Sequence, residues 1–78
     1  MLNTSDSGTL VRALRSRLGL TQEKFAAKLG VALPTINRWE NGRSKPSPLA
    51  LQRIEQILED MKGAGGDLLE EYFPGSGP

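Results

Sequence analysis

Apolar side chains recur at the three- and four-residue spacing of helices along most of this 78-residue chain. A first helix is expected to end at about Leu18, with Ser7 or Thr9 available to cap its N-terminus. The further helices expected from the pattern cover about 22–29, 33–41, 48–62 and 68–73. No long stretch alternates between apolar and polar residues as a half-buried strand does. The pattern therefore predicts an all-α fold of five helices.

Start and stop signals separate these helices. Thr21, Ser47 and Asp67 each precede an apolar run and can accept a hydrogen bond from the first turn as N-caps. Gly30 follows the second helix and can adopt the positive φ that ends a helix. Ala32 stands where the third helix should be capped, so the amides there are left free for another acceptor such as a phosphate.

The second and third helices are short and are joined by the turn at Gly30. Ala26 and Gly30 lie four residues apart, and their small size would let the third helix cross the second closely. Pro34 falls in the first turn of the third helix, where its missing N–H does no harm. This arrangement predicts a helix-turn-helix.

The third helix has two chemically different sides when residues are placed about 100° apart. Ile36 and Trp39 share one side, and we expect Trp39 to be a core residue rather than a stacking platform for bases. The other side collects Pro34, Asn37, Arg38 and Asn41. That face has no carboxylate, and its Arg and Asn side chains can bond base edges without repelling phosphates.

Composition narrows the class of protein. A chain of this size forms one small domain. It has no cysteine and no histidine, so a disulfide framework, a thiolate or imidazole metal site and a histidine base are excluded. We therefore expect no enzymatic activity, no cofactor, no metal and no small-molecule ligand. No apolar run approaches the roughly 18 residues of a membrane span, and a signal peptide is not recognisable, which favours a cytoplasmic protein without membrane contact.

Charge is divided along the chain although the net charge is only +1. Residues 12–45 hold eight Lys or Arg against two Glu, a sum of +6, whereas residues 46–78 hold two against six acids, a sum of −4. A segregated positive field of this kind attracts and orients a polyanion. Ordinary surface charge is the alternative reading of the same asymmetry.

The motif T-Q-x-x-x-A, then G-V, then T-I-x-R-W-E-N-G-R-x-K-P, fills most of residues 21–46. It resembles the Cro/lambda-repressor-like (XRE) family, and the resemblance extends from about Leu10 to Leu58. It implies a compact five-helix lambda-repressor-like domain, here 8–73, between a flexible N-terminus (1–7) and a flexible tail (74–78). The implied function is sequence-specific binding of double-stranded DNA by a prokaryotic or phage transcriptional regulator, such as a repressor, with helix 3 in the major groove.

The resemblance also implies roles for individual residues. The positions that face base edges are Leu33, Pro34, Asn37 and Arg38. The positions that contact phosphate are Gln22, Thr35, Asn41, Arg43 and Lys45. Gln22 would also brace the recognition helix, and Arg15 would pair with Glu40. Leu33 and Pro34 depart from the polar readers common in the family, so they are expected to press on thymine methyl groups and leave Arg38 to read a guanine.

Alternatives stay open at several positions. Gln22 could be merely solvated, and solvated helix faces are the expectation for Arg12, Arg17, Lys24, Lys28 and Arg53. The apolar residues of the last helix, which are Leu68, Leu69, Tyr72 and Phe73, could fold back onto the core or form a patch for a homodimer, and fold-back is favoured. A different function for the same fold is an antitoxin-like or adaptor module whose acidic C-terminal half contacts a partner protein, and an accessory role beside a modification enzyme is a further possibility.

Overall fold

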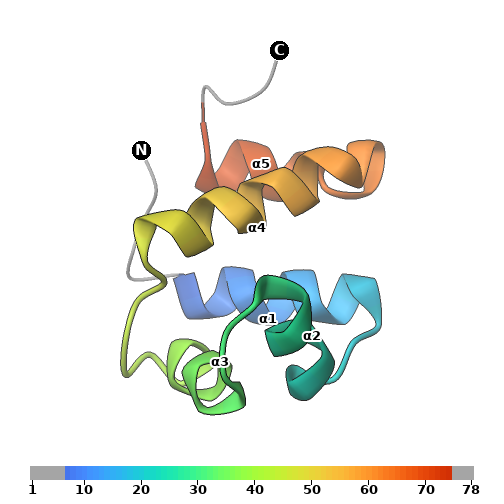
Figure 1. The fold of residues 1–78 in the computed structure, drawn as a ribbon. Helices are drawn as coiled ribbons and strands as arrows, with labels where there is room; N and C mark the ends of the chain where they lie inside the picture. The colour runs from blue at the N-terminus through green and yellow to red at the C-terminus, as the bar shows by residue number, and fades with distance from the viewer. Residues whose placement is uncertain (1–6, 75–78) are drawn as a thin grey trace.

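A computed structural model describes residues 7–74, and these residues form helices without any strand. The helices are α1 (Ser7–Leu18), α2 (Gln22–Leu29), α3 (Leu33–Glu40), α4 (Pro48–Asp60) and α5 (Gly66–Tyr72), with a 3-10 turn at Lys62–Ala64. Figure 1 shows α2 and α3 at one end of the molecule, α4 and α5 at the other, and α1 between them. The predicted all-α fold with five helices is confirmed.

The core takes side chains from every helix. Its buried members are Leu10, Val11, Leu14, Phe25, Ala26, Leu29, Ile36, Trp39, Ala50, Ile54, Leu58, Leu68 and Tyr72. Leu69 and Phe73 are partly buried against the same cluster. The prediction that the last helix folds back onto the core is therefore confirmed.

Most of the predicted helix boundaries are confirmed. Thr21 Oγ1 accepts a hydrogen bond from the Lys24 amide at 3.1 Å, and Gly30 ends α2 with a φ of 74°. Ala32 stands at the N-cap of α3 without a side-chain hydrogen bond. Ser47 Oγ accepts from Ala50 N at 3.2 Å, and α4 ends a little earlier than expected, before the 3-10 turn.

Two predicted caps are wrong. Helix α1 begins at Ser7, so Ser7 and Thr9 are both already helical and neither precedes the helix. Gly65 occupies the N-cap of α5, and Asp67 lies inside the first turn, where its carboxylate binds Arg17 instead. The segments expected to be flexible, 1–7 and 74–78, lie outside the described residues except for Ser7 and Pro74.

Close approach between helices occurs at a glycine that the sequence pattern did not single out. A Cβ placed on Gly8 of α1 would lie 2.5 Å from the carbonyl oxygen of Trp39, at the end of α3. At Gly30 the nearest atom to such a Cβ is an Arg53 guanidinium nitrogen at 3.8 Å, which is ordinary contact. The prediction of close crossing at Gly30 is therefore wrong. Gly30 serves the turn through its positive φ, and Gly8 lets α1 contact α3.

Candidate nucleic-acid interface

Helix α3 is fixed to the core by one side and exposes the other. Ile36 is fully buried and Trp39 is 4% exposed, which confirms the structural role expected for Trp39. The four residues predicted to face bases are all exposed and belong to the opposite side, and they are Leu33, Pro34, Asn37 and Arg38. Leu33 is 41% exposed, which leaves its apolar side chain available for contact.

Glu40 is the only acid of α3, and it is withdrawn from the outer surface. Its side chain is 2% exposed. One carboxylate oxygen accepts from Arg15 Nε at 2.7 Å, and the other accepts from Arg15 Nη2 and from Gln22 Nε2, each at 3.1 Å. Arg12 Nε lies 3.5 Å from the second oxygen, and Arg12 Nη2 donates to the Glu40 carbonyl at 3.1 Å. The ion pair expected between Arg15 and Glu40 is present.

The charge state of this cluster follows from its contacts. Burial by itself raises the pKa of Glu40, but the hydrogen bonds from Arg15 and Gln22 and the positive charges of Arg15 and Arg12 outweigh burial and hold that pKa below its ordinary value. The hydrogen bond to Glu40 likewise raises the pKa of Arg15. Glu40 is therefore ionised at neutral pH and neutralised by the arginines of α1.

A line of side-chain amides connects Glu40 to the outer side of α3. Gln22, the first residue of α2, donates to Glu40 and accepts from Asn37 Nδ2 at 3.4 Å. Asn37 Oδ1 in turn accepts from Asn41 Nδ2 at 2.9 Å. The expectation that Gln22 braces the recognition helix thus corresponds to two hydrogen bonds between α2 and α3. Gln22 is therefore not merely solvated, which was the alternative.

The other residues predicted to contact phosphate lie along the same surface. Thr35 is half-buried and its Oγ1 accepts from Arg38 Nη2 at 3.4 Å. Arg43 and Lys45 are exposed in the loop after α3. Gly42 opens this loop with a φ of 73°, and the Arg43 amide bonds back to the Arg38 carbonyl at 2.9 Å. The turn therefore keeps the basic loop next to the C-terminal end of α3.

Two of the three arginines expected on solvated helix faces are exposed but also bind partners within the fold. Arg12 binds Glu40 as described, although 61% of its side chain is exposed. Arg17 makes a two-point contact with Asp67 at 2.6 and 2.7 Å and also donates to the Ala64 carbonyl. The Arg17 hydrogen bond lowers the pKa of Asp67 to about 2. These partners are 28 and 50 residues away along the chain, so no local pattern could indicate them.

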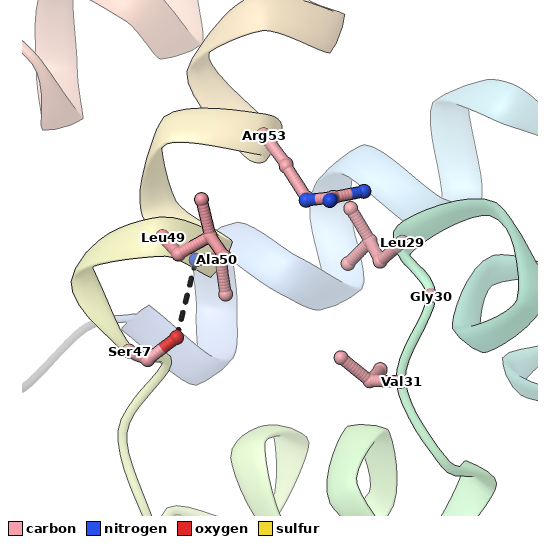
Figure 2. Close-up of a pocket in the computed structure, with 7 residues that line it drawn as sticks. All are labelled: Leu29, Gly30, Val31, Ser47, Leu49, Ala50 and Arg53. Carbon is pink, nitrogen blue, oxygen red and sulfur yellow. Dashed lines mark hydrogen bonds between the residues drawn. The ribbon is translucent and has the colours of Figure 1, made fainter.

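A shallow pocket of about 110 Å³ lies away from the outer side of α3, between the end of α2 and the start of α4 (Figure 2). It is lined by Leu29, Gly30, Val31, Ser47, Leu49, Ala50 and Arg53. Arg53 is the only charged residue in this lining, and Figure 2 shows its guanidinium group extending across Leu29. The pocket therefore offers apolar side chains, the Ser47 hydroxyl and a single cation.

Within 7–74, acidic side chains do not gather in the groups of three or more that could hold a metal ion. None of the helices in the same part of the chain is long and apolar enough to cross a membrane.

Two short helices around a glycine turn, with an exposed carboxylate-free face on the second, define a helix-turn-helix domain of the DNA-binding class. The helix-turn-helix family model matches residues 11–59. The chain belongs to this family, and among its members it is of the Cro/lambda-repressor-like (XRE) kind.

Relatives with similar sequences carry corresponding names. An uncharacterised HTH-type transcriptional regulator of Methanothermobacter thermautotrophicus is 46% identical over 65 residues, which cover 83% of this chain and 86% of that protein. The regulatory protein cro of Pseudomonas phage D3 is 36% identical, over 82% of this chain and 85% of its own. The chain spans about half of a longer regulator from Sinorhizobium medicae, at 36% identity and 48% of that protein. No solved structure matches the chain significantly.

Proposed function

We propose that the protein is a transcription regulator that binds double-stranded DNA sequence-specifically and inserts α3 into the major groove. The observation that carries this proposal is the exposed side of α3, which presents an arginine and amides while its only acid, Glu40, is buried and neutralised. A face of that composition can approach phosphates and still bond base edges. The relatives named as transcriptional regulators and as a phage cro protein support it.

The proposed division of contacts keeps the roles that the family resemblance implies. Base edges are assigned to Leu33, Pro34, Asn37 and Arg38. Phosphates are assigned to Gln22, Thr35, Asn41, Arg43 and Lys45. The exposed Leu33 supplies an apolar contact for a thymine methyl group, and Arg38 supplies a two-point donor for guanine. A homodimer, which a pseudo-palindromic operator would match, stays a prediction.

The acidic C-terminal half gives less support to the alternative, an antitoxin-like or adaptor module. Asp67 is engaged within the domain by Arg17, and Leu68 and Tyr72 are buried in the core. The groups that such a partner would bind are therefore partly used by the fold itself.

Arg38→Ala tests the base-reading assignment. Loss of a two-point contact to guanine removes about 1 to 3 kcal/mol of discrimination, so binding to the preferred duplex should fall more than binding to random duplex. Selection of bound sequences from a random duplex pool identifies the preferred site, and titration of both duplexes measures the two losses. Equal losses on both would remove Arg38 from the base-reading residues.

Lys45→Ala tests the phosphate assignment. Because a phosphate contact carries no sequence information, affinity for specific and random duplex should fall alike, and the log–log dependence on salt should flatten by roughly one unit. Titrations at several salt concentrations measure that slope. The exposed Lys62, in the 3-10 turn after α4, provides a matched control as Lys62→Ala, and equal slopes for the two variants would contradict the assignment.

A further inference from the structure

Hydrogen bonds run in one direction from the outer side of α3 to the buried carboxylate at its end. Asn41 donates to Asn37, Asn37 donates to Gln22, and Gln22 donates to Glu40, at 2.9, 3.4 and 3.1 Å. We name this series the amide relay. It begins at an exposed residue of the proposed DNA-contacting face and ends at a side chain that is 2% exposed.

The direction of the relay is set by Glu40. A carboxylate held ionised by two hydrogen bonds from Arg15 can only accept, so Gln22 has to turn its NH₂ group toward Glu40. The carbonyl oxygen of Gln22 then faces Asn37, which must present its own NH₂ group there. Reversing any one amide would place two acceptors or two donors against each other.

Asn37 keeps half of its hydrogen-bonding capacity for another molecule. A side-chain amide has two N–H donors and two acceptor sites. In Asn37 one N–H is used toward Gln22 and one acceptor site toward Asn41. The remaining N–H lies on the Gln22 side and the remaining acceptor site on the Asn41 side, and the residue is exposed.

We propose that Glu40, acting through Gln22, fixes the orientation of the Asn37 amide and thereby makes Asn37 a reader of adenine that rejects guanine and thymine. Adenine offers an acceptor at N7 beside a donor at N6, which matches the free N–H and acceptor of a fixed Asn37. Guanine offers acceptors at both N7 and O6, so the fixed carbonyl oxygen would face another acceptor. Thymine would place its methyl group and O4 there instead.

Glu40 and Gln22 are positioning residues in this proposal. An amide that is free to turn over can donate to guanine O6 or thymine O4, so release of the relay should weaken discrimination without removing the amide. This inference rests on the proposed function, because it assigns a specificity to the DNA-contacting face of α3.

Gln22→Met separates the relay from the fold. The change keeps the length of the side chain and leaves the ion pair between Arg15 and Glu40 intact. Gln52→Met is the matched control, because Gln52 is exposed on α4. Asn37→Ala identifies the base position that Asn37 reads. Glu40→Gln releases the relay in a second way, because the new side-chain amide can donate to Gln22 and so permits the reversed orientation of the relay. Urea unfolding checks that each variant is folded.

Sequences selected from a random duplex pool by each folded variant are compared with those of the wild type. At the position lost in Asn37→Ala, preference for adenine over guanine and thymine should fall by about tenfold in Gln22→Met, while other positions and the Gln52→Met profile stay unchanged. Uniform weakening with unchanged base preference would overturn the relay and leave Gln22 a phosphate contact only. An unchanged Asn37→Ala profile would overturn it too.

Failure of the inference is distinguishable from failure of the proposed function. If the wild-type protein selects no motif at all, the proposed sequence-specific binding fails and the relay with it. If the wild type selects a motif that Arg38→Ala alters but Gln22→Met does not, the proposed function stands and the relay is refuted.

Discussion

Glu40 shows how one side chain can serve stability and surface chemistry together. Its carboxylate binds α1 through Arg15 and Arg12 and binds α2 through Gln22, so three helices meet at this group. Because the charge is buried and paired, α3 gains an acid that holds it in place without presenting that acid to a polyanion. The cost of desolvating the carboxylate is offset only while its partners remain.

Glu40→Ala should therefore be strongly destabilising. It leaves Arg15, whose side chain is 23% exposed, without its anionic partner, and a loss of about 3 kcal/mol in the free energy of unfolding is expected. Arg12→Ala removes a longer and more exposed contact and should cost no more than about 1 kcal/mol. Urea unfolding of both variants measures the difference, and similar losses would show that the Glu40 cluster is not anchored through Arg15.

The family pattern identified the pair of Arg15 and Glu40, but the partners of Arg12 and Arg17 were not predictable from the sequence. A pattern of helical spacing places a residue on a face of its own helix and says nothing about which distant segment covers that face. Arg17 meets Asp67 only because α5 folds back beside α1, and that return depends on the packing of Leu68 and Tyr72. The local sequence suggested that Asp67 caps the last helix, whereas in the fold its carboxylate binds the distant Arg17.

At the scale of the helices, the meeting of α1 and α3 depends on the missing side chain of Gly8. The backbone of α1 lies so close to the last carbonyls of α3 that a methyl group has no room beside Trp39 and Glu40. The neighbouring atoms are backbone, which cannot turn aside as a flexible side chain can. Both this close backbone contact and the Glu40 cluster hold α3 at its C-terminal end.

Gly8→Ala should loosen this contact. Overpacking of a tight interface costs typically about 1 to 3 kcal/mol, and that range exceeds the benefit of alanine over glycine within a helix. Gly63→Ala is the control, because a Cβ there meets nothing within 4 Å and should change stability little. Thermal unfolding compares the two, and a Gly8→Ala variant as stable as the control would contradict the close approach.

Boundaries of helices were predictable where the signal is local. Thr21 and Ser47 cap their own helices, and Gly30 ends α2 by its own conformation, so each acts within a few residues. The close contact at Gly8 depends on α3, which lies more than 20 residues further along the chain. From the sequence alone, a glycine inside a helical pattern indicates only a less stable helix. Its role in close packing becomes visible once the neighbouring helix is known.

For the molecule as a whole, α1 supplies the arginine of each ion pair within 7–74, both the buried and the exposed ones. Arg12 and Arg15 bind Glu40 at the end of α3, and Arg17 binds Asp67 in α5. In contrast, ion pairs within 7–74 do not involve the cations of α2, α3 and the following loop, which are Lys24, Lys28, Arg38, Arg43 and Lys45. The positive field predicted from the sequence is therefore concentrated on the side of α2 and α3, because two carboxylates, Glu40 and Asp67, offset most of the charge of the three arginines of α1.

Acid should weaken both attachments of α1. Glu40 and Asp67 have folded-state pKa values below their ordinary 4.5 and 3.8, so the stability they provide is complete above those values. It is lost as pH falls through the folded-state values, which for Asp67 means toward about 2. Chemical unfolding at several pH values should show stability declining below about pH 4.

Asp67→Asn isolates one part of that acid response. The variant lacks the carboxylate whose pKa is lowered by Arg17, so its decline in stability between pH 4 and pH 2 should be shallower than that of the wild type. Glu70→Gln, an exposed change on the same helix, should leave the wild-type decline in place. Equal declines in wild type and Asp67→Asn would mean that the contact with Arg17 does not contribute.

Exposure of Leu33, Pro34 and Arg38 has a consequence for how such a domain diversifies. None of the three belongs to the core, so a replacement at these positions leaves the free energy of folding nearly unchanged. Mutation can then sample many outward surfaces on one fold without first acquiring compensating changes elsewhere. If these side chains contact bases as proposed, a duplicated copy of the gene can acquire a new target in single steps, each of which passes through a folded protein.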